Sequence, residues 1–287
     1  MSRRTIGVLG VAILAAVSAS ARGQPIQQVS FPSADGRTTL VGYLFLPDRA
    51  GRRTPAIVLM HGRSGAYSST ANGDYSAATL RRRDATWARL WATKGYVALL
   101  VDSYGPRGYP DGFAAGTHDE RPGAINEVTV RPLDAYGALV FLRARPDVAG
   151  DRIGLQGWSN GASAALATMA VNGAGSAGRT AATGFRVALA FYPGCGLDGQ
   201  FAAGYRPYAP VRIFIGDADE EVSPASCQKL ADRNAALGGG VDLTVYPGAT
   251  HDFDDPINHR QDNPANVAAS QDALARATAF FDAALRP

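Results

Sequence analysis

The stretch that decides the fold reads Ile153-Gly154-Leu155-Gln156-Gly157-Trp158-Ser159-Asn160-Gly161. Its first four residues predict a strand, and the Ala-rich segment after Asn160 predicts a helix. A G-x-S-x-G pattern at a strand-to-helix turn is typical of a nucleophile elbow, in which a tight, strained turn exposes the serine hydroxyl. The N-terminus of the following helix favours developing negative charge. We therefore expect Ser159 to be a nucleophile; the alternative is a helix-capping serine in a Gly-rich turn.

Short apolar runs alternate with helical patterns along the rest of the chain. The predicted strands cover residues 27–31, 39–45, 56–60, 96–101, 153–156, 186–191, 212–215 and 241–246, and the predicted helices cover 84–94, 132–145, 160–171, 224–237 and 264–285. This alternation predicts an eight-stranded, mostly parallel sheet with helices on both faces. The Asp35-Gly36 turn predicts an antiparallel hairpin at its edge. No linker is visible, so we expect residues 22–287 to form a single α/β domain.

Two irregular stretches, 63–83 and 103–131, follow predicted strand ends. An open α/β sheet places its ligand crevice at these ends of its strands. We expect the two stretches to form the walls of a pocket; the alternative is that they are ordinary surface loops.

The N-terminus is typical of an export leader. Arg3 and Arg4 precede an apolar run over residues 6–19 and the small residues around Ala21, which is the order of a secretory signal peptide. The run has about 14 residues, fewer than the ~20 that a spanning helix needs. We therefore predict that residues 1–21 are a signal peptide, that the protein is periplasmic or secreted, and that it has no stable membrane insertion. The paired arginines leave twin-arginine export open.

Composition excludes several classes of protein. The chain has 28 Lys and Arg against 25 Asp and Glu, a net charge of +3, and loss of the two leader arginines leaves about +1. A charge so close to balance, without a basic stripe, predicts no nucleic-acid partner. Two cysteines exclude a disulfide-dense mini-domain and a multi-cysteine metal module.

A nucleophile elbow requires an acid and a histidine later in the chain, in that order. His251 follows the last predicted strand and is the expected general base, whereas His259 is expected at the surface. The preceding predicted strand ends in the run Asp217-Ala218-Asp219-Glu220-Glu221. We favour Asp219 as the acid. Asp217 remains the main rival, although it lies close enough to the strand end to bond turn amides instead.

The expected oxyanion hole consists of two backbone N–H groups. One is that of Asn160, directly after the nucleophile. The other should follow the predicted strand 56–60, and we assign it to Arg63, with Ser64 as the alternative. His61, in the same turn, is expected to be structural.

Taken together, these motifs resemble the dienelactone hydrolase family of α/β-hydrolases over about residues 27–285. The segments that carry the resemblance are 59–62 (LMHG), 101–108 (VDSYGPRG), 152–155 (RIGL), 157–161 (GWSNG), 216–224 (GDADEEVSP) and 248–253 (GATHDF). The family's acid and base patterns fall on Asp219 and His251. The resemblance implies hydrolysis of a small-molecule ester or lactone through an acyl-enzyme, with no metal and no organic cofactor.

One departure from the family concerns the nucleophile. The best-known members have a cysteine at the elbow, where this chain has Ser159. A serine depends more strictly on the histidine base than a thiol does. We therefore expect a general carboxylic-ester hydrolase rather than an enzyme for dienelactone itself.

Further expectations concern the surroundings of the site. Arg107 and Arg63 are candidates to bind a substrate carboxylate, and Tyr104, Trp158 and Tyr192 are candidate pocket walls. Cys195 and Cys227 follow neighbouring predicted strands, and an exported protein meets an oxidising compartment. We therefore predict a Cys195–Cys227 disulfide; the alternative is two separate buried thiols.

Two other functions remain open. A peptidase of the prolyl-oligopeptidase kind shares the elbow and the order of the triad, but this chain has no room for the N-terminal propeller of the large members. A non-catalytic binding protein on a hydrolase scaffold is the other alternative, and the complete Ser, Asp and His set argues against it. The sequence indicates neither the oligomeric state nor the natural substrate.

Overall fold

Apolar strands form the centre of the molecule. The computed structural model describes residues 24–48, 53–256 and 258–287, so the predicted leader lies outside the described residues. The strands are β1 Gln27–Pro32, β2 Thr39–Phe45, β3 Thr54–Met60, β4 Val97–Asp102, β5 Val148–Trp158, β6 Ala188–Phe191, β7 Val211–Gly216 and β8 Val241–Tyr246. They form one eight-stranded sheet in the order β1-β2-β4-β3-β5-β6-β7-β8.

The sheet is parallel from β4 to β8, as the alternating pattern predicts. β3 pairs in parallel with both β4 and β5, and the parallel pairing continues through β6 and β7 to β8. β2 is antiparallel to both β1 and β4, which gives the expected antiparallel edge. The predicted α/β architecture with eight strands is confirmed.

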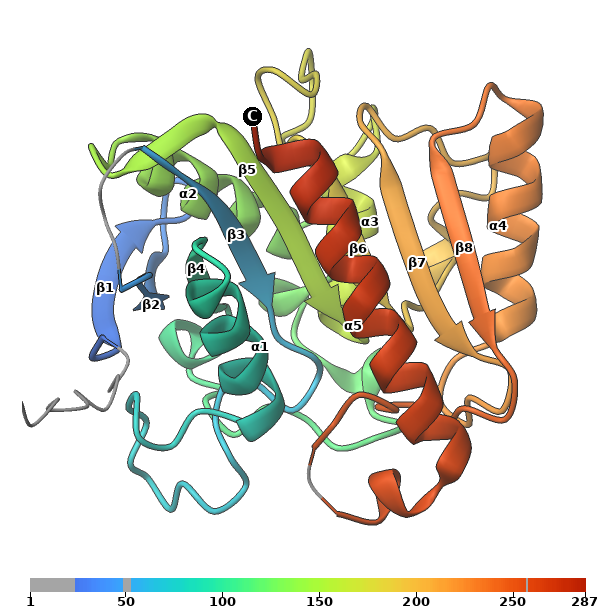
Figure 1. Cartoon of the computed structure of the whole chain (residues 1–287), viewed down its shortest axis with the longest axis horizontal. Helices are drawn as coiled ribbons and strands as arrows, with labels where there is room; N and C mark the ends of the chain where they lie inside the picture. The colour runs from blue at the N-terminus through green and yellow to red at the C-terminus, as the bar shows by residue number, and fades with distance from the viewer. Residues whose placement is uncertain (1–23, 49–52, 257) are drawn as a thin grey trace, which may run out of the picture.

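Helices cover both faces of the sheet. They are α1 Arg82–Thr93, α2 Arg131–Arg143, α3 Asn160–Met169, α4 Pro224–Ala236 and α5 Pro264–Leu285, together with the short 3-10 helices η1 Gly105–Arg107, η2 His118–Glu120, η3 Gly123–Ile125, η4 Leu197–Gly199 and η5 Asn258–Asp262. In Figure 1, α1 and α5 lie in front of the sheet, and α2 and α3 lie behind it. Because both faces are covered, every residue of β4 is buried.

The carboxyl ends of the parallel strands meet at one edge of the sheet, the lower edge in Figure 1. The connections that follow β3, β7 and β8 lie at this edge, and they contain the candidate oxyanion turn, acid and base. The fold therefore brings together residues that lie nearly 200 positions apart in the sequence.

The strand that leads into the elbow is longer than its apolar run indicates. β5 begins at Val148, which pairs with Thr54, and the register shifts before Ile153 pairs with Ala56. Because the polar residues Asp151 and Arg152 interrupt the apolar run, the hydrophobicity pattern does not indicate this first part of the strand. No helix in the described part of the chain is both long and apolar enough to cross a membrane.

Candidate active site

Ser159 lies in a strained turn between β5 and α3. Its backbone has φ 51° and ψ −118°, a region that only a tightly held non-glycine residue occupies. A Cβ on Gly157 would collide with the carbonyl oxygen of Gly161, and one on Gly161 would collide with that of Met60. Both glycines of the motif are thus required by close backbone approach. Ser159 is 8% exposed, so its hydroxyl lies at the floor of the site.

His251 joins Ser159 to a buried carboxylate. The Nε2 atom of His251 lies 3.0 Å from the Ser159 Oγ, and Nδ1 lies 2.8 and 3.0 Å from the two carboxylate oxygens of Asp219. An ionised carboxylate only accepts hydrogen bonds, so Nδ1–H donates to Asp219 and Nε2 accepts from the Ser159 hydroxyl. This is the protonation state that a general base toward Ser159 requires.

The structure separates the two candidate acids. The side chain of Asp219 is fully buried and also accepts the N–H groups of Glu221 and Val222, each at 2.9 Å, which fixes its carboxylate toward His251. Asp217 instead accepts the N–H of Gly248 at 2.6 Å. Asp217 therefore closes a turn, and Asp219 is the acid that the fold places beside the histidine.

The surrounding charges tune the imidazole. Burial lowers the pKa of His251, but the hydrogen bond to Asp219 and the carboxylates of Asp252 and Glu221 outweigh it. The net result is a His251 pKa above its ordinary 6.5. The site therefore stabilises the imidazolium form, which a general base adopts after it takes a proton.

A small cavity of about 10 Å³ lies over Ser159. Its lining residues are Gly62, Arg63, Ser64, Arg81, Arg83, Ser159, His251 and Asp252. The guanidinium of Arg63 donates to both carboxylate oxygens of Glu221, at 3.1 and 2.6 Å. Arg81 also lines the cavity, and no ion pair of its side chain is found among the described residues. Three guanidinium groups and one carboxylate, that of Asp252, therefore line the cavity beside the nucleophile.

The candidate oxyanion hole lies where the sequence indicates. Arg63 follows the end of β3 and lines the cavity with Ser159, while Asn160 is the first residue of α3. In the described part of the chain, no hydrogen bond uses the backbone N–H of either residue. Ser64 lines the same cavity and remains the alternative to Arg63.

His61 lies beneath this turn. It is fully buried, its Nδ1 donates to the carbonyl of Gly62 at 2.7 Å, and its Nε2 accepts the N–H of Ser103 at 3.2 Å. Burial holds the pKa of His61 well below 6.5. His61 is therefore a neutral residue that connects two loops, as expected.

Arg107 does not lie in the pocket, which corrects the expectation that it binds substrate. Its two Nη atoms donate to Asp134, each at 2.9 Å, and Nη2 also donates to Asp35 at 3.0 Å. The side chain is 7% exposed. Two buried carboxylates thus occupy its donors, and the residue connects η1 to α2 and to the turn after β1. The side chain of Arg63 is likewise engaged, by Glu221.

The three aromatic residues expected as pocket walls are fully buried core residues instead. Tyr104 donates to Glu127 and packs edge-on against His61, with 4.6 Å between the ring centroids. Trp158 lies below the elbow, where it stacks on Phe191. Tyr192 packs against the imidazole of His251, with 4.6 Å between ring centroids. Tyr192 therefore supports the base rather than the substrate.

A buried charged network that was not predicted from the sequence lies below His251. Arg83 donates to Asp84, Asp252 and the hydroxyl of Tyr192. Asp254 accepts hydrogen bonds from Trp87, Trp158 and Tyr192. The only signal in the sequence is the density of carboxylates after His251, in the run Asp252-Phe253-Asp254-Asp255.

A disulfide lies beside the site. Cys195, after β6, is bonded to Cys227 in α4. The bond connects the loop that begins at Tyr192 to the helix that follows the Asp219 loop. The disulfide therefore joins the loop that contains Tyr192 to α4.

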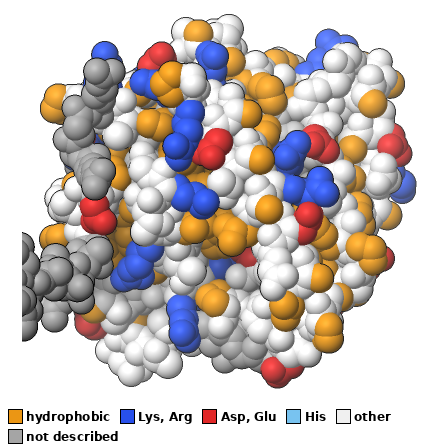
Figure 2. All heavy atoms as spheres, in the orientation of Figure 1, with side chains coloured by type: hydrophobic (Ala, Val, Ile, Leu, Met, Phe, Trp, Pro, Cys, Tyr) orange, Lys and Arg blue, Asp and Glu red, His pale blue; other side chains and the backbone are white. Residues whose placement is uncertain are grey.

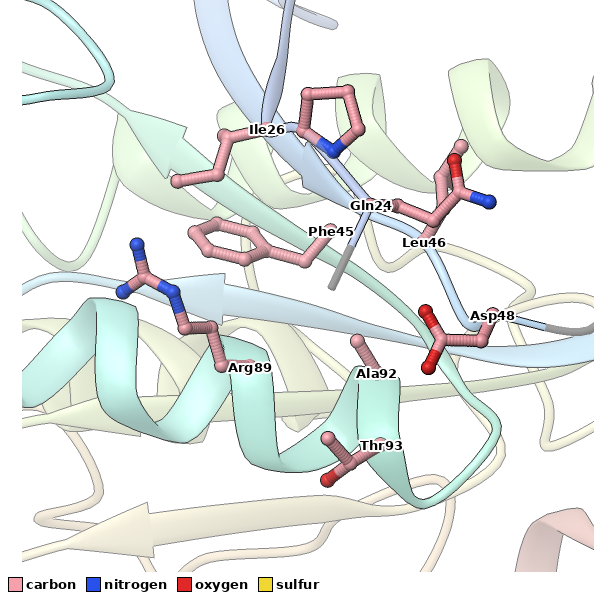
Figure 3. Close-up of a pocket in the computed structure, with 9 residues that line it drawn as sticks. Gln24, Ile26, Phe45, Leu46, Asp48, Arg89, Ala92 and Thr93 are labelled. Carbon is pink, nitrogen blue, oxygen red and sulfur yellow. The ribbon is translucent and has the colours of Figure 1, made fainter. Parts of the chain in front are cut away.

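Larger cavities lie away from Ser159. Figure 3 shows one of about 450 Å³ between the β1–β2 hairpin and α1, where Arg89 lies over the ring of Phe45. Phe45 pairs with Ala98 at the start of β4, so this cavity is at the opposite edge of the sheet from Ser159. No nucleophile and base are paired among its lining residues.

Among residues 24–48, 53–256 and 258–287, no group of three or more His, Cys, Asp or Glu side chains is arranged to hold a metal ion. On the face drawn in Figure 2, Lys and Arg side chains are scattered among other residues rather than gathered in one stripe.

The sheet order, the strained serine elbow and the histidine after β8 define an α/β-hydrolase. The family model of the dienelactone hydrolase family matches residues 40–285, so the chain belongs to that family. By class it is a carboxylic ester hydrolase.

Solved structures show the same fold at low sequence identity. A dienelactone hydrolase-like promiscuous phosphotriesterase, P91, from metagenomic libraries is 18% identical, with a TM-score of 0.66 over 91% of this chain and 99% of that one. An esterase from Thermogutta terrifontis is 22% identical, with a TM-score of 0.61 over 93% and 95%. A putative dipeptidyl aminopeptidase IV from Bacteroides ovatus is 19% identical, with a TM-score of 0.63, but the match covers 37% of that chain.

Proposed function

We propose that the protein is an exported serine hydrolase that cleaves small carboxylic esters or lactones through an acyl-enzyme. Ser159 is the nucleophile, His251 the general base and Asp219 the residue that orients the base. The observation that carries the proposal is the continuous hydrogen-bonded chain from Ser159 Oγ through His251 to buried Asp219.

Acylation begins when Ser159 Oγ attacks the ester carbonyl carbon and its proton passes to Nε2 of His251. The backbone N–H groups of Arg63 and Asn160 stabilise the oxyanion of the tetrahedral intermediate. The imidazolium then gives its proton to the leaving alcohol, and the acyl group remains on Ser159. Asp219 stabilises the imidazolium through Nδ1–H.

Deacylation repeats these steps with water. His251 takes a proton from the water, whose oxygen attacks the acyl carbon, and returns the proton to Ser159 Oγ as the carboxylic acid leaves. The guanidinium of Arg81, which lines the cavity, favours the negative charge that develops in both halves of the reaction. The residues supply every proton transfer, so the cycle requires no cofactor.

Export rests on the N-terminal pattern of residues 1–21 and is supported by the disulfide, because such bonds persist in oxidising compartments. Mass spectrometry of the protein recovered from the periplasm or medium tests it. A mature N-terminus near residue 22 is the expected result. An intact Met1 would contradict cleavage, and retention of the protein in the cytoplasm would contradict export.

Hydrolysis of p-nitrophenyl esters by the wild type and by Ser159→Ala tests the mechanism. We expect turnover in the wild type only, and a fluorophosphonate label on Ser159. Equal turnover by the variant would refute the mechanism, and absence of turnover and labelling in both would favour a binding protein. Cleavage of peptide anilides in preference to esters would favour the peptidase alternative.

A further inference from the structure

One buried carboxylate connects four separate parts of the fold. The Oδ2 atom of Asp254 accepts the indole N–H of Trp87 at 2.8 Å and that of Trp158 at 2.9 Å, and Oδ1 accepts the hydroxyl of Tyr192. Trp87 lies in α1, Trp158 ends β5, Tyr192 follows β6 and Asp254 follows β8. These are the elements that surround the proposed nucleophile and base.

Two of the residues that donate to Asp254 lie next to reacting groups. Trp158 is the residue before Ser159, and the ring of Tyr192 lies 4.6 Å from the ring of His251. Asp254 itself is three residues after His251 in the same loop. A shift of Asp254 would therefore move the elbow and the imidazole relative to each other.

The choice of a carboxylate is informative because burying one is costly. An ionised carboxylate has only acceptors, so it satisfies three converging donors, whereas an asparagine whose carbonyl faces the two indoles leaves the Tyr192 hydroxyl without its acceptor. The guanidinium of Arg83 donates to the hydroxyl of Tyr192 at 3.1 Å, and that hydroxyl in turn donates to Asp254.

We propose that Asp254 is a positioning residue that fixes the geometry between Ser159 and His251. This inference rests on the proposed serine mechanism. Asp254 acts through Trp158 on the elbow and through Tyr192 on the imidazole, and it does not touch the substrate. A displacement of about 1 Å in a reacting group can lower a rate about a hundredfold.

Protonation of Asp254 gives the proposal a signature in the pH profile. Burial raises the pKa of Asp254 to about 6, although the charge of Arg83 and the bonds from Tyr192 and Trp158 oppose this rise. The charged and titratable groups around it are Arg83, Tyr192 and Asp252, and Trp87 and Trp158 are neutral donors. The hydrogen of the protonated acid either is donated to the Tyr192 hydroxyl or faces an indole N–H, so the original pattern of three donors on one carboxylate is lost as the pH falls below about 6.

The test uses Asp254→Asn, which keeps the shape of the side chain, and Asp102→Asn as a matched control. Asp102 is also buried and accepts three hydrogen bonds, from Tyr67, Tyr104 and Gly105, at 2.8 to 3.1 Å. None of these donors contacts Ser159 or His251. Both variants should lower the melting temperature, but only Asp254→Asn should lower kcat, by about ten- to a hundredfold with little change in KM.

Two further readouts separate positioning from plain stability. In the wild type, log kcat/KM should fall more steeply than a slope of one just below pH 6, because Asp254 gains a proton in addition to His251, and in Asp254→Asn the slope should stay at one. The downfield NMR signal of His251 Nδ1–H should shift or broaden in Asp254→Asn and persist in Asp102→Asn. Tyr192→Phe should lower kcat by less in the Asp254→Asn background than in the wild type.

The outcomes are decisive in both directions. Wild-type kcat, pH slope and NMR signal in folded Asp254→Asn would overturn the proposal, as would an equal loss of kcat in Asp102→Asn. The NMR signal requires no turnover, so it tests the positioning role even if Ser159→Ala shows that the serine mechanism is wrong.

Discussion

Arg63 and Glu221 form a two-pronged ion pair beside the proposed nucleophile, with 2.6 Å between Nη2 and Oε1. Arg63 comes from the turn after β3 and Glu221 from the loop after β7, so the pair joins the proposed oxyanion turn to the loop of the acid. The other carboxylate oxygen of Glu221 lies 3.7 Å from Nε2 of His251. The pair is therefore placed to tune the base as well as to hold the two loops.

Replacing Glu221 should shift the acid limb of the pH profile. The carboxylate of Glu221 helps to raise the pKa of His251, so Glu221→Gln should lower that pKa and leave more neutral imidazole at low pH. The midpoint of kcat/KM against pH should then move to lower pH. Arg63→Gln should move it the opposite way, because the negative charge of Glu221 then acts on His251 alone.

High salt should shrink both shifts, because the ion pair is about one-fifth exposed. Profiles measured at low and high ionic strength check this dependence. Identical midpoints in the wild type and both variants would show that the pair holds loops without tuning His251.

Asp219 and Asp217 offer a matched pair of substitutions. Asp219→Asn should lower kcat by about 10⁴-fold, because an amide no longer holds the imidazole in the required tautomer. Asp217→Asn should leave kcat within a few-fold of the wild type and act on stability alone, since its carboxylate serves the Gly248 turn. Ester turnover and thermal melts of both variants check this, and a larger loss of kcat at position 217 would assign the acid to Asp217.

The disulfide should contribute to stability through the loop that it closes. Cys195 and Cys227 are 32 positions apart, and a loop of this size contributes about 2–4 kcal/mol to the free energy of unfolding. The double variant Cys195→Ser with Cys227→Ser should therefore melt at a lower temperature than the wild type. Reductant should lower the melting temperature of the wild type but not that of the double variant. Alkylation of two thiols in the absence of reductant would contradict the bond.

The fold could be predicted from the sequence because its signals are local. Each buried strand is a short apolar run, and the Gly157–Gly161 turn allows no larger residue at either glycine. The candidate nucleophile, acid and base could be placed because the order of motifs along the chain reflects the order of strand ends. The sequence favours Asp219 over Asp217 because Asp217, which is nearer the strand end, is expected to bond the backbone amides of the turn.

The remainder of the site depends on side-chain partners that no pattern reveals. Arg107 has the right position in the sequence for a pocket residue, yet Asp35 and Asp134 bind it from distant segments. Tyr192 and Trp158 face inward because Asp254 accepts their donors. A spacing rule identifies the loop that contains a residue, but only packing determines which way its side chain points.

Arg107 should prove to be a stability residue. Arg107→Gln removes the cation from two buried carboxylates, which typically costs about 3–5 kcal/mol. Arg145→Gln is the matched control, because the Arg145–Asp147 pair is partly exposed and should cost at most about 1 kcal/mol. Without the cation, the folded-state pKa values of Asp35 and Asp134 rise, so the deficit of Arg107→Gln should be largest at neutral pH and shrink toward about pH 4 as these carboxyls protonate. Denaturant melts at both pH values measure it, and an increase in KM for a carboxylate-bearing ester, with stability unchanged, would return Arg107 to the substrate pocket.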